Sequence, residues 1–118
     1  FRAAYVMVWI ACAESIKRRF EEAGNRDSTA GKVSTKIRKM ESQHASIDTT
    51  LLEEAKQYGF ITDSEYTELI YIYNMRCIYG HPYELAPTEE QVVHAVSTVV
   101  RIIMSKPVKM REGFISQL

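Results

Sequence analysis

The sequence contains few of the residues that mark a metal centre, a disulfide framework or a phosphate-binding loop. It has two cysteines, Cys12 and Cys77, which lie 65 positions apart in apolar helical segments, and it has no CxxC or HxxxH spacing. Its five glycines stand singly, so no glycine-rich phosphate loop is present. We therefore predict no metal and no cofactor. We interpret the cysteines as buried thiols of a protein in a reducing, cytoplasmic compartment.

Long apolar runs are also missing. The longest, residues 3–13, has 11 residues, whereas a membrane-spanning helix takes about 20. The run continues into a charged segment without a processing site, which argues against a signal peptide, and we expect no membrane association. Because the chain opens on Phe1, it is interpreted as an excised domain or a processed chain. Neighbouring domains, such as a fused effector domain, would then lie outside this sequence.

Neither sign of charge is in excess. Fifteen Lys and Arg residues balance fifteen Asp and Glu residues, which by itself argues against a polyanionic partner. The distribution is uneven, however: residues 1–44 carry a net +4, residues 45–99 a net −7 and residues 100–118 a net +3. If the first and last segments pack together, they form a basic face that collects phosphates. The alternative is a set of solvated helix faces.

The spacing of apolar residues is helical nearly throughout, and it predicts an all-α bundle of about five helices in one domain. Capping boxes are expected at Thr62 and Thr88, because each precedes a Glu or Gln by three residues. Residues 1–105 form the predicted domain, and residues 106–118 form a tail that links it to absent regions. The expected helices span residues 2–23, 32–43, 48–58, 62–79 and 88–105.

The first helix is apolar on all sides between Tyr5 and Ile10. Such a helix must be covered all round. A domain this small has few neighbours to cover it, so the run indicates either a subunit interface or a central core helix.

Polar residues stand out where the fourth helix ends, in the segment from Asn74 to Tyr83. Arg76 and His81 are five residues apart, so Gly80 would have to unwind the helix for the two side chains to meet. The i, i+7 spacing of Asn74 and His81 would let the amide orient the imidazole. An imidazole can take a proton from a ribose hydroxyl, and a guanidinium can stabilise the charge growing on the phosphate.

One chain supplies a single Arg76 and His81, whereas cleavage of a phosphodiester needs two proton-transfer groups. Two chains related by a twofold axis would supply both pairs and a groove for a single strand. The alternative roles are structural: His81 binds a carbonyl, and Arg76 stacks on a ring or pairs with an acid such as Glu14. Similarly, Tyr71, Tyr73 and Tyr79 either stack on bases or belong to the core, and His94 is expected to be half-buried.

The segment from Arg76 to His81 resembles the Arg-x4-His signature of the HEPN superfamily (higher eukaryotes and prokaryotes nucleotide-binding domains). Its place before a final long helix is similar, as is an apolar first helix that carries Glu14. The resemblance covers residues 3–105. It implies a helical homodimer that acts as a metal-independent ribonuclease of toxin, phage-defence or RNA-processing systems, with Arg76 and His81 catalytic and a cyclic phosphate product. Glu14 and Asn74 would support the site, and the basic second helix would bind RNA through Lys32, Lys36, Arg38 and Lys39.

Two further residues bear on that resemblance. Cys77 stands where active members often have Asn, and a thiol does not replace the donors and acceptors of an amide. Tyr83 extends the signature to Arg-x4-His-x-Tyr, which is similar to toxins whose Tyr is modified by a nucleotidyltransferase antitoxin; the alternative is a packing aromatic.

Two functions follow: a dimeric endoribonuclease that cuts single-stranded RNA, or a non-catalytic dimerisation module that binds nucleic acid or nucleotide.

Overall fold

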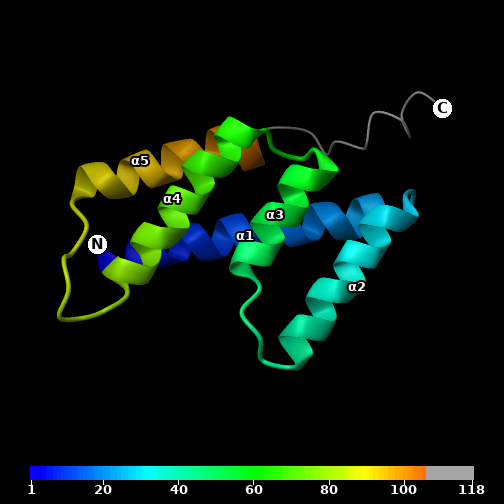
Figure 1. Ribbon diagram of the computed structural model, residues 1–118. Coiled ribbons are helices and arrows are strands. Elements are labelled where there is room, and N and C mark those ends of the chain that lie inside the picture. Colours follow the sequence, from blue (N-terminus) through cyan, green and yellow to red (C-terminus); the bar gives the residue numbers. More distant parts are fainter. Residues whose placement is uncertain (106–118) are drawn as a thin grey trace.

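A computed structural model describes residues 1–105, and these form five α-helices and a short π-helical segment without any strand (Figure 1). The predicted all-α class and the number of helices are therefore confirmed. The proposed tail, residues 106–118, lies outside the described residues. The elements are α1 (Arg2–Gly24), α2 (Ser28–Ser42), α3 (Asp48–Tyr58), α4 (Asp63–Tyr79), α5 (Glu89–Val99) and η1 (Val100–Met104).

Helix α1 is the centre of the bundle. It packs against α2, α3, α4, α5 and η1, and it runs lengthwise through the molecule (Figure 1). Tyr5 and Trp9 are buried among these neighbours, which confirms a core role for the apolar run. Met7 and Ile10 of the same run remain exposed, so the described residues leave part of it uncovered.

Helix α4 runs antiparallel to the first half of α1. The ring of Tyr5 contacts that of Tyr79 edge-on at 4.8 Å between centroids, and Trp9 lies 5.2 Å from Tyr73. Residue numbers therefore increase along α1 where they decrease along α4. The carboxyl end of α4, with the expected site, is brought beside the amino end of α1.

Local sequence signals set most helix ends. Both capping boxes are present: Thr62 with Glu65 at the start of α4, and Thr88 with Gln91 at the start of α5. Gly59 ends α3 in the left-handed conformation (φ 95°), which glycine adopts without strain. The fifth helix continues through η1 to Met104, as expected from its apolar spacing.

Helix α2 begins four residues earlier than expected, at Ser28 instead of Lys32. Asp27 is its N-cap and accepts a hydrogen bond from the Thr29 amide at 3.0 Å. The Tyr58 hydroxyl donates to the same carboxylate at 2.7 Å. This second bond joins α2 to α3 and holds a buried acid in place.

Helix α3 also differs from the expectation at its first turn, because Ile47 is the N-cap and Asp48 lies inside the helix. The Asp48 carboxylate accepts instead from the indole Nε1 of Trp9 at 2.8 Å. Among the described residues, no helix is both long enough and apolar enough to span a membrane.

Candidate functional site

Arg76 lies on the face of α4 that points into the bundle. Leu69, Ile72 and Tyr79 occupy the same face at helical spacing, and all three are buried. The Nε atom of Arg76 is buried and has no hydrogen-bond partner. The two terminal nitrogens are not among the buried unpaired atoms of the described chain, so they reach solvent from this inner position.

Neither structural role considered for Arg76 is present in the described part of the chain. Glu14 pairs with Lys17 at 2.9 Å, and Lys17 also binds Glu41 of α2 at 2.9 Å. The carboxylate suggested as a partner is thus engaged between α1 and α2. The described residues contain one cation–π contact, which joins Lys56 to Tyr66 and does not involve Arg76.

His81 lies in an exposed turn directly after α4. Its amide donates to the Ile78 carbonyl at 3.2 Å, and its carbonyl accepts from the Glu84 amide at 3.1 Å. Its ring makes no hydrogen bond to the residues that the structure describes. The imidazole is therefore exposed and free of protein partners within residues 1–105.

Helix α4 ends at Gly80, as expected, but this glycine does not use its conformational freedom. Gly80 has right-handed angles (φ −70°, ψ −18°) and is the first residue of the turn. A Cβ at Gly80 would lie 3.2 Å from the Arg76 carbonyl oxygen, which is a close contact within the last turn of the helix.

The turn that carries His81 is held by Arg2, a residue that sequence analysis missed. The guanidinium reaches from the first turn of α1 to four carbonyl oxygens, one at the end of α4 and three in the α4–α5 loop. Nη1 donates to Tyr79 (3.1 Å), His81 (2.7 Å) and Leu85 (3.3 Å), and Nη2 donates to Glu84 (2.6 Å). A cation placed at the carboxyl end of α4 also complements the helix dipole. The bonds to Tyr79 and His81 restrain the backbone on both sides of Gly80.

Asn74 is not brought to the imidazole. It is exposed, and two residues along a helix turn its direction by about 200° from that of Arg76. No hydrogen bond joins Asn74 to His81 within residues 1–105. The structure therefore shows no contact through which Asn74 could orient the imidazole.

Tyr83 is 100% exposed. It therefore packs against no other part of the described chain, and the alternative of a packing aromatic is wrong. Its hydroxyl is open to a modifying enzyme.

Cys77 is half-buried and Cys12 is fully buried, and both thiols are free, so full burial is confirmed for Cys12 only. Burial raises the pKa of the Cys12 thiol to about 12. A hydrogen bond to Cys77 is the largest cause of a raised pKa at Tyr73. Cys77 therefore interacts with the preceding turn of α4, not with His81. His94 is exposed, whereas we expected it to be half-buried.

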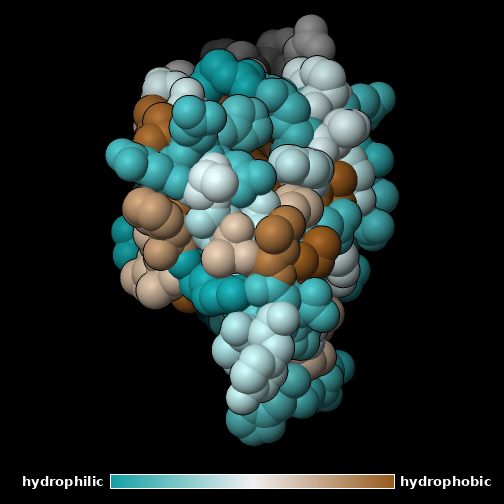
Figure 2. Space-filling model, turned by 90° about the vertical axis from the view of Figure 1, so that its left-hand side faces the viewer, coloured by the Kyte–Doolittle hydropathy of each residue, from teal (hydrophilic) through white to brown (hydrophobic). Residues whose placement is uncertain are grey.

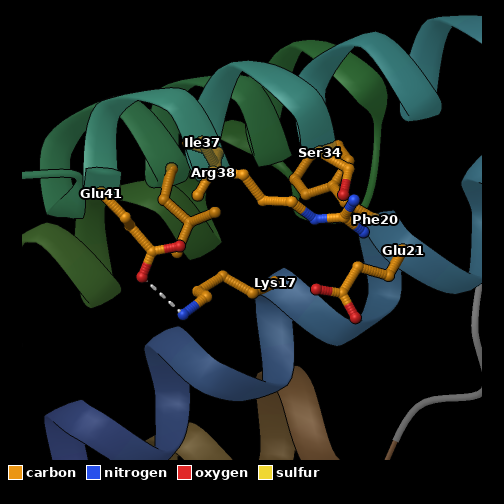
Figure 3. A pocket seen from close by; sticks show the side chains of 8 residues that line it. Lys17, Phe20, Glu21, Ser34, Ile37, Arg38 and Glu41 are labelled. Carbon is orange, nitrogen blue, oxygen red and sulfur yellow. Dashed lines mark hydrogen bonds and ion pairs between the residues drawn. The ribbon is translucent and has the colours of Figure 1, made fainter. Parts of the chain in front are cut away.

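The basic residues of α2 lie at the other end of the molecule from the α4–α5 loop (Figure 1). Lys36 pairs with Glu54 of α3 at 3.0 Å. Arg38 lines the cleft between α1 and α2, where Figure 3 shows it with Glu41 facing Lys17 and Glu21 of α1.

This cleft has a volume of about 10 Å³, room for one water molecule. Of the four cations expected to bind RNA, Lys32 and Lys39 are exposed and have no ion-pair partner in the described segment. The first and last segments do meet, since Arg19 of α1 donates to the Ile103 carbonyl.

No group of three or more His, Cys, Asp or Glu residues in the described region could hold a metal ion. Comparison with family models, with curated proteins and with solved structures gives no match. The likeness to HEPN domains therefore depends on Arg76, His81 and their helical setting alone.

The unpaired Nε gives a test of why Arg76 is present. We expect Arg76→Met to leave the free energy of unfolding unchanged or to raise it by about 1 kcal/mol, because a buried donor without a partner is removed. Urea unfolding measures this, with Tyr79→Ala as a control that should lose about 3–5 kcal/mol. A loss of about 2 kcal/mol or more in Arg76→Met would contradict an arginine free of structural bonds.

The contacts of Arg2 predict a local effect. In Arg2→Ala, amide hydrogen exchange in the α4–α5 loop should quicken on the order of tenfold, because the carbonyls lose their donor while the core is intact. Exchange in α3 should be unchanged. Arg18→Ala, which removes an exposed arginine of the same helix, should change neither region. Equal loop protection in wild type and Arg2→Ala would refute the restraint.

Proposed function

We propose that this protein is a metal-independent endoribonuclease of the HEPN type, which cuts single-stranded RNA at a site shared by two copies of the chain. One observation carries the proposal: Arg76 keeps an unpaired guanidinium at the end of α4, with an unpaired imidazole in the next turn. Neither group has a structural partner in the described chain. Both are free for an anion and a hydroxyl.

The chemistry needs no metal. His81 of one copy removes the proton from a ribose 2′ hydroxyl, and the 2′ oxygen bonds to phosphorus while the bond to the 5′ oxygen breaks. His81 of the second copy gives a proton to that leaving oxygen. The products are a 2′,3′-cyclic phosphate and a free 5′ hydroxyl. Arg76 donates to the phosphate oxygens, whose charge increases in the transition state.

The surface around His81 supports a contact between two copies. Figure 2 views the molecule from this end, where apolar patches are interleaved with polar ones. Exposed apolar side chains lie close to the turn: Ile78 and Leu85 flank it in the chain, and Phe1 precedes Arg2, which binds it. A twofold contact that covers them would bring two α4–α5 loops together and exclude water from the phosphate.

The setting that the proposal implies is a toxin or phage-defence system. Such a nuclease must be silenced in the cell that makes it. The exposed Tyr83 hydroxyl lies two residues after His81. A nucleotide transferred to it by a nucleotidyltransferase antitoxin would place a phosphate beside Arg76 and obstruct the groove.

Cleavage in EDTA tests the proposal. Wild-type protein should degrade single-stranded RNA and leave cyclic phosphate ends, and His81→Ala should lose on the order of 10²–10⁴-fold in rate. His44→Ala is the matched control, because His44 is also an exposed loop histidine, and it should cut at the wild-type rate. Equal rates for wild type and His81→Ala would mean another site or a contaminant. A monomer under cleavage conditions would overturn the shared site.

A second function is favoured by two observations. Cys77 follows Arg76 in place of an amide, and α2, which carries the free cations, lies at the other end of the molecule from the α4–α5 loop (Figure 1). Both suit a non-catalytic module that holds RNA on α2. In that case His81 would not contribute to affinity.

Charge reversal on α2 separates the two functions. If α2 binds RNA, changing Lys32 and Lys39 together to Glu should weaken binding. The slope of log K against log salt concentration should become shallower by about 0.7 for each phosphate that the variant no longer neutralises. Fluorescence anisotropy at several salt concentrations measures both. Lys56→Glu on α3 is the control and should bind as wild type does. An unchanged salt slope in the double variant would exclude α2 as the RNA surface.

A further inference from the structure

A polar hollow of about 340 Å³ lies beside the α4–α5 loop, between the start of α1, the end of α4 and the start of α5. Three tyrosines from α1 and α4 line one side, and Glu90, Gln91 and His94 of α5 line the other. Its volume is within the range of small-ligand sites, about 300–1,000 Å³. Nothing in the proposed mechanism uses this hollow.

The floor of the hollow consists of two hydroxyl groups that have no protein partner. Tyr5 and Tyr79 are only 2% and 1% exposed. Neither hydroxyl has a hydrogen bond within residues 1–105, yet neither is among the buried unpaired atoms, so both oxygens open into the hollow. Each hydroxyl can therefore bond to water or to a ligand in the hollow.

The tyrosine hydroxyls are close enough to affect each other's pKa. Burial raises the pKa of Tyr5 to about 12, and the nearby Tyr79 and Tyr71 contribute to the same rise. Burial likewise raises the pKa of Tyr79. Both hydroxyls therefore stay protonated at neutral pH, and each can donate one hydrogen bond to a ligand while it accepts another.

The rim of the hollow favours a flat, neutral ligand. Tyr71 is 51% exposed, so its ring is open for stacking. The Glu90 carboxylate accepts hydrogen bonds only, and no Lys or Arg of the described chain lines the hollow. A phosphate would be repelled by the negative charge of Glu90. The amino and imino groups of a base, in contrast, can donate hydrogen bonds to its carboxylate.

We propose that this hollow binds one unpaired nucleobase of the RNA. The inference rests on the proposed function for the identity of the polymer. Tyr79 precedes His81 by two residues, so a base held here belongs to a nucleotide next to the scissile phosphate. Stacking on Tyr71 tolerates any base. Glu90 favours guanine, whose edge presents adjacent N–H donors.

Nucleoside binding tests this without cleavage. Guanosine, adenosine, cytidine and uridine carry no phosphate, so their affinity does not depend on Arg76. Titration followed by amide NMR shifts should place guanosine at the hollow, with shifts confined to the residues around it, and should rank it above uridine. Glu90→Gln should weaken guanosine about three- to tenfold and remove that preference.

Removal of the floor hydroxyls is the sharper test. The variant with Tyr5→Phe and Tyr79→Phe should bind guanosine about tenfold more weakly or worse, because two hydrogen bonds to the ligand are removed. Its stability should not fall, because the removed hydroxyls have no partner in the described chain. Tyr66→Phe, outside the hollow, is the matched control and should bind normally. If the double variant fails to fold, the two single variants give the same test.

The outcomes separate this inference from the nuclease proposal. If wild-type protein binds none of the four nucleosides, or if the floor variant binds as well as wild type, the hollow is no base site. If guanosine binds there and the protein cuts no RNA in EDTA, the nuclease proposal fails and the base site stands.

Discussion

The packing of α1 is the constraint on which the other features depend. Its apolar half has to be removed from water on several sides, and all four other α-helices pack against α1. Pairing of Trp9 with Tyr73 and of Tyr5 with Tyr79 sets α4 antiparallel to α1. The register of these rings places Arg76 between them along the helix. An arginine is thereby held at the centre of an aromatic face, with its buried Nε unpaired.

The same register explains how the loop after α4 is held. Arg2 precedes Tyr5 by about one turn of α1, and His81 follows Tyr79 by two residues, so the pairing of the two rings brings Arg2 to the loop. Its bonds to Tyr79 and His81 connect the central helix to the exposed turn after α4. A loop of polar and apolar residues without regular structure would otherwise sample many conformations. The restraint fixes the backbone of His81 and leaves its ring free.

Sequence analysis predicted the features that depend on neighbouring residues. The capping boxes at Thr62 and Thr88 were expected because both partners lie within one turn. The start of α2 was missed, although Asp27 is a good N-cap residue, because Tyr58, which holds its carboxylate, is 31 residues away. The bonds of Arg2 span still longer separations and leave no local pattern. The hollow was missed for the same reason: Tyr71 and Tyr79 were recognised as able to stack on bases, but nothing local placed Glu90 beside them.

The charges at this end of the molecule are separated in a way that matches a nucleotide. The described residues that line the hollow include hydroxyls and a carboxylate but no lysine or arginine, whereas Arg76 lies in the last turn of α4 and Arg2 binds the carbonyls at its end. A nucleotide is itself divided into a neutral base, with donors at its edge, and an anionic phosphate. Reversal of the nucleotide would put the phosphate against Glu90 and leave Arg76 without an anion. Under the two proposals, these neighbourhoods would select one orientation of the nucleotide, with its sugar hydroxyl towards the turn that carries His81.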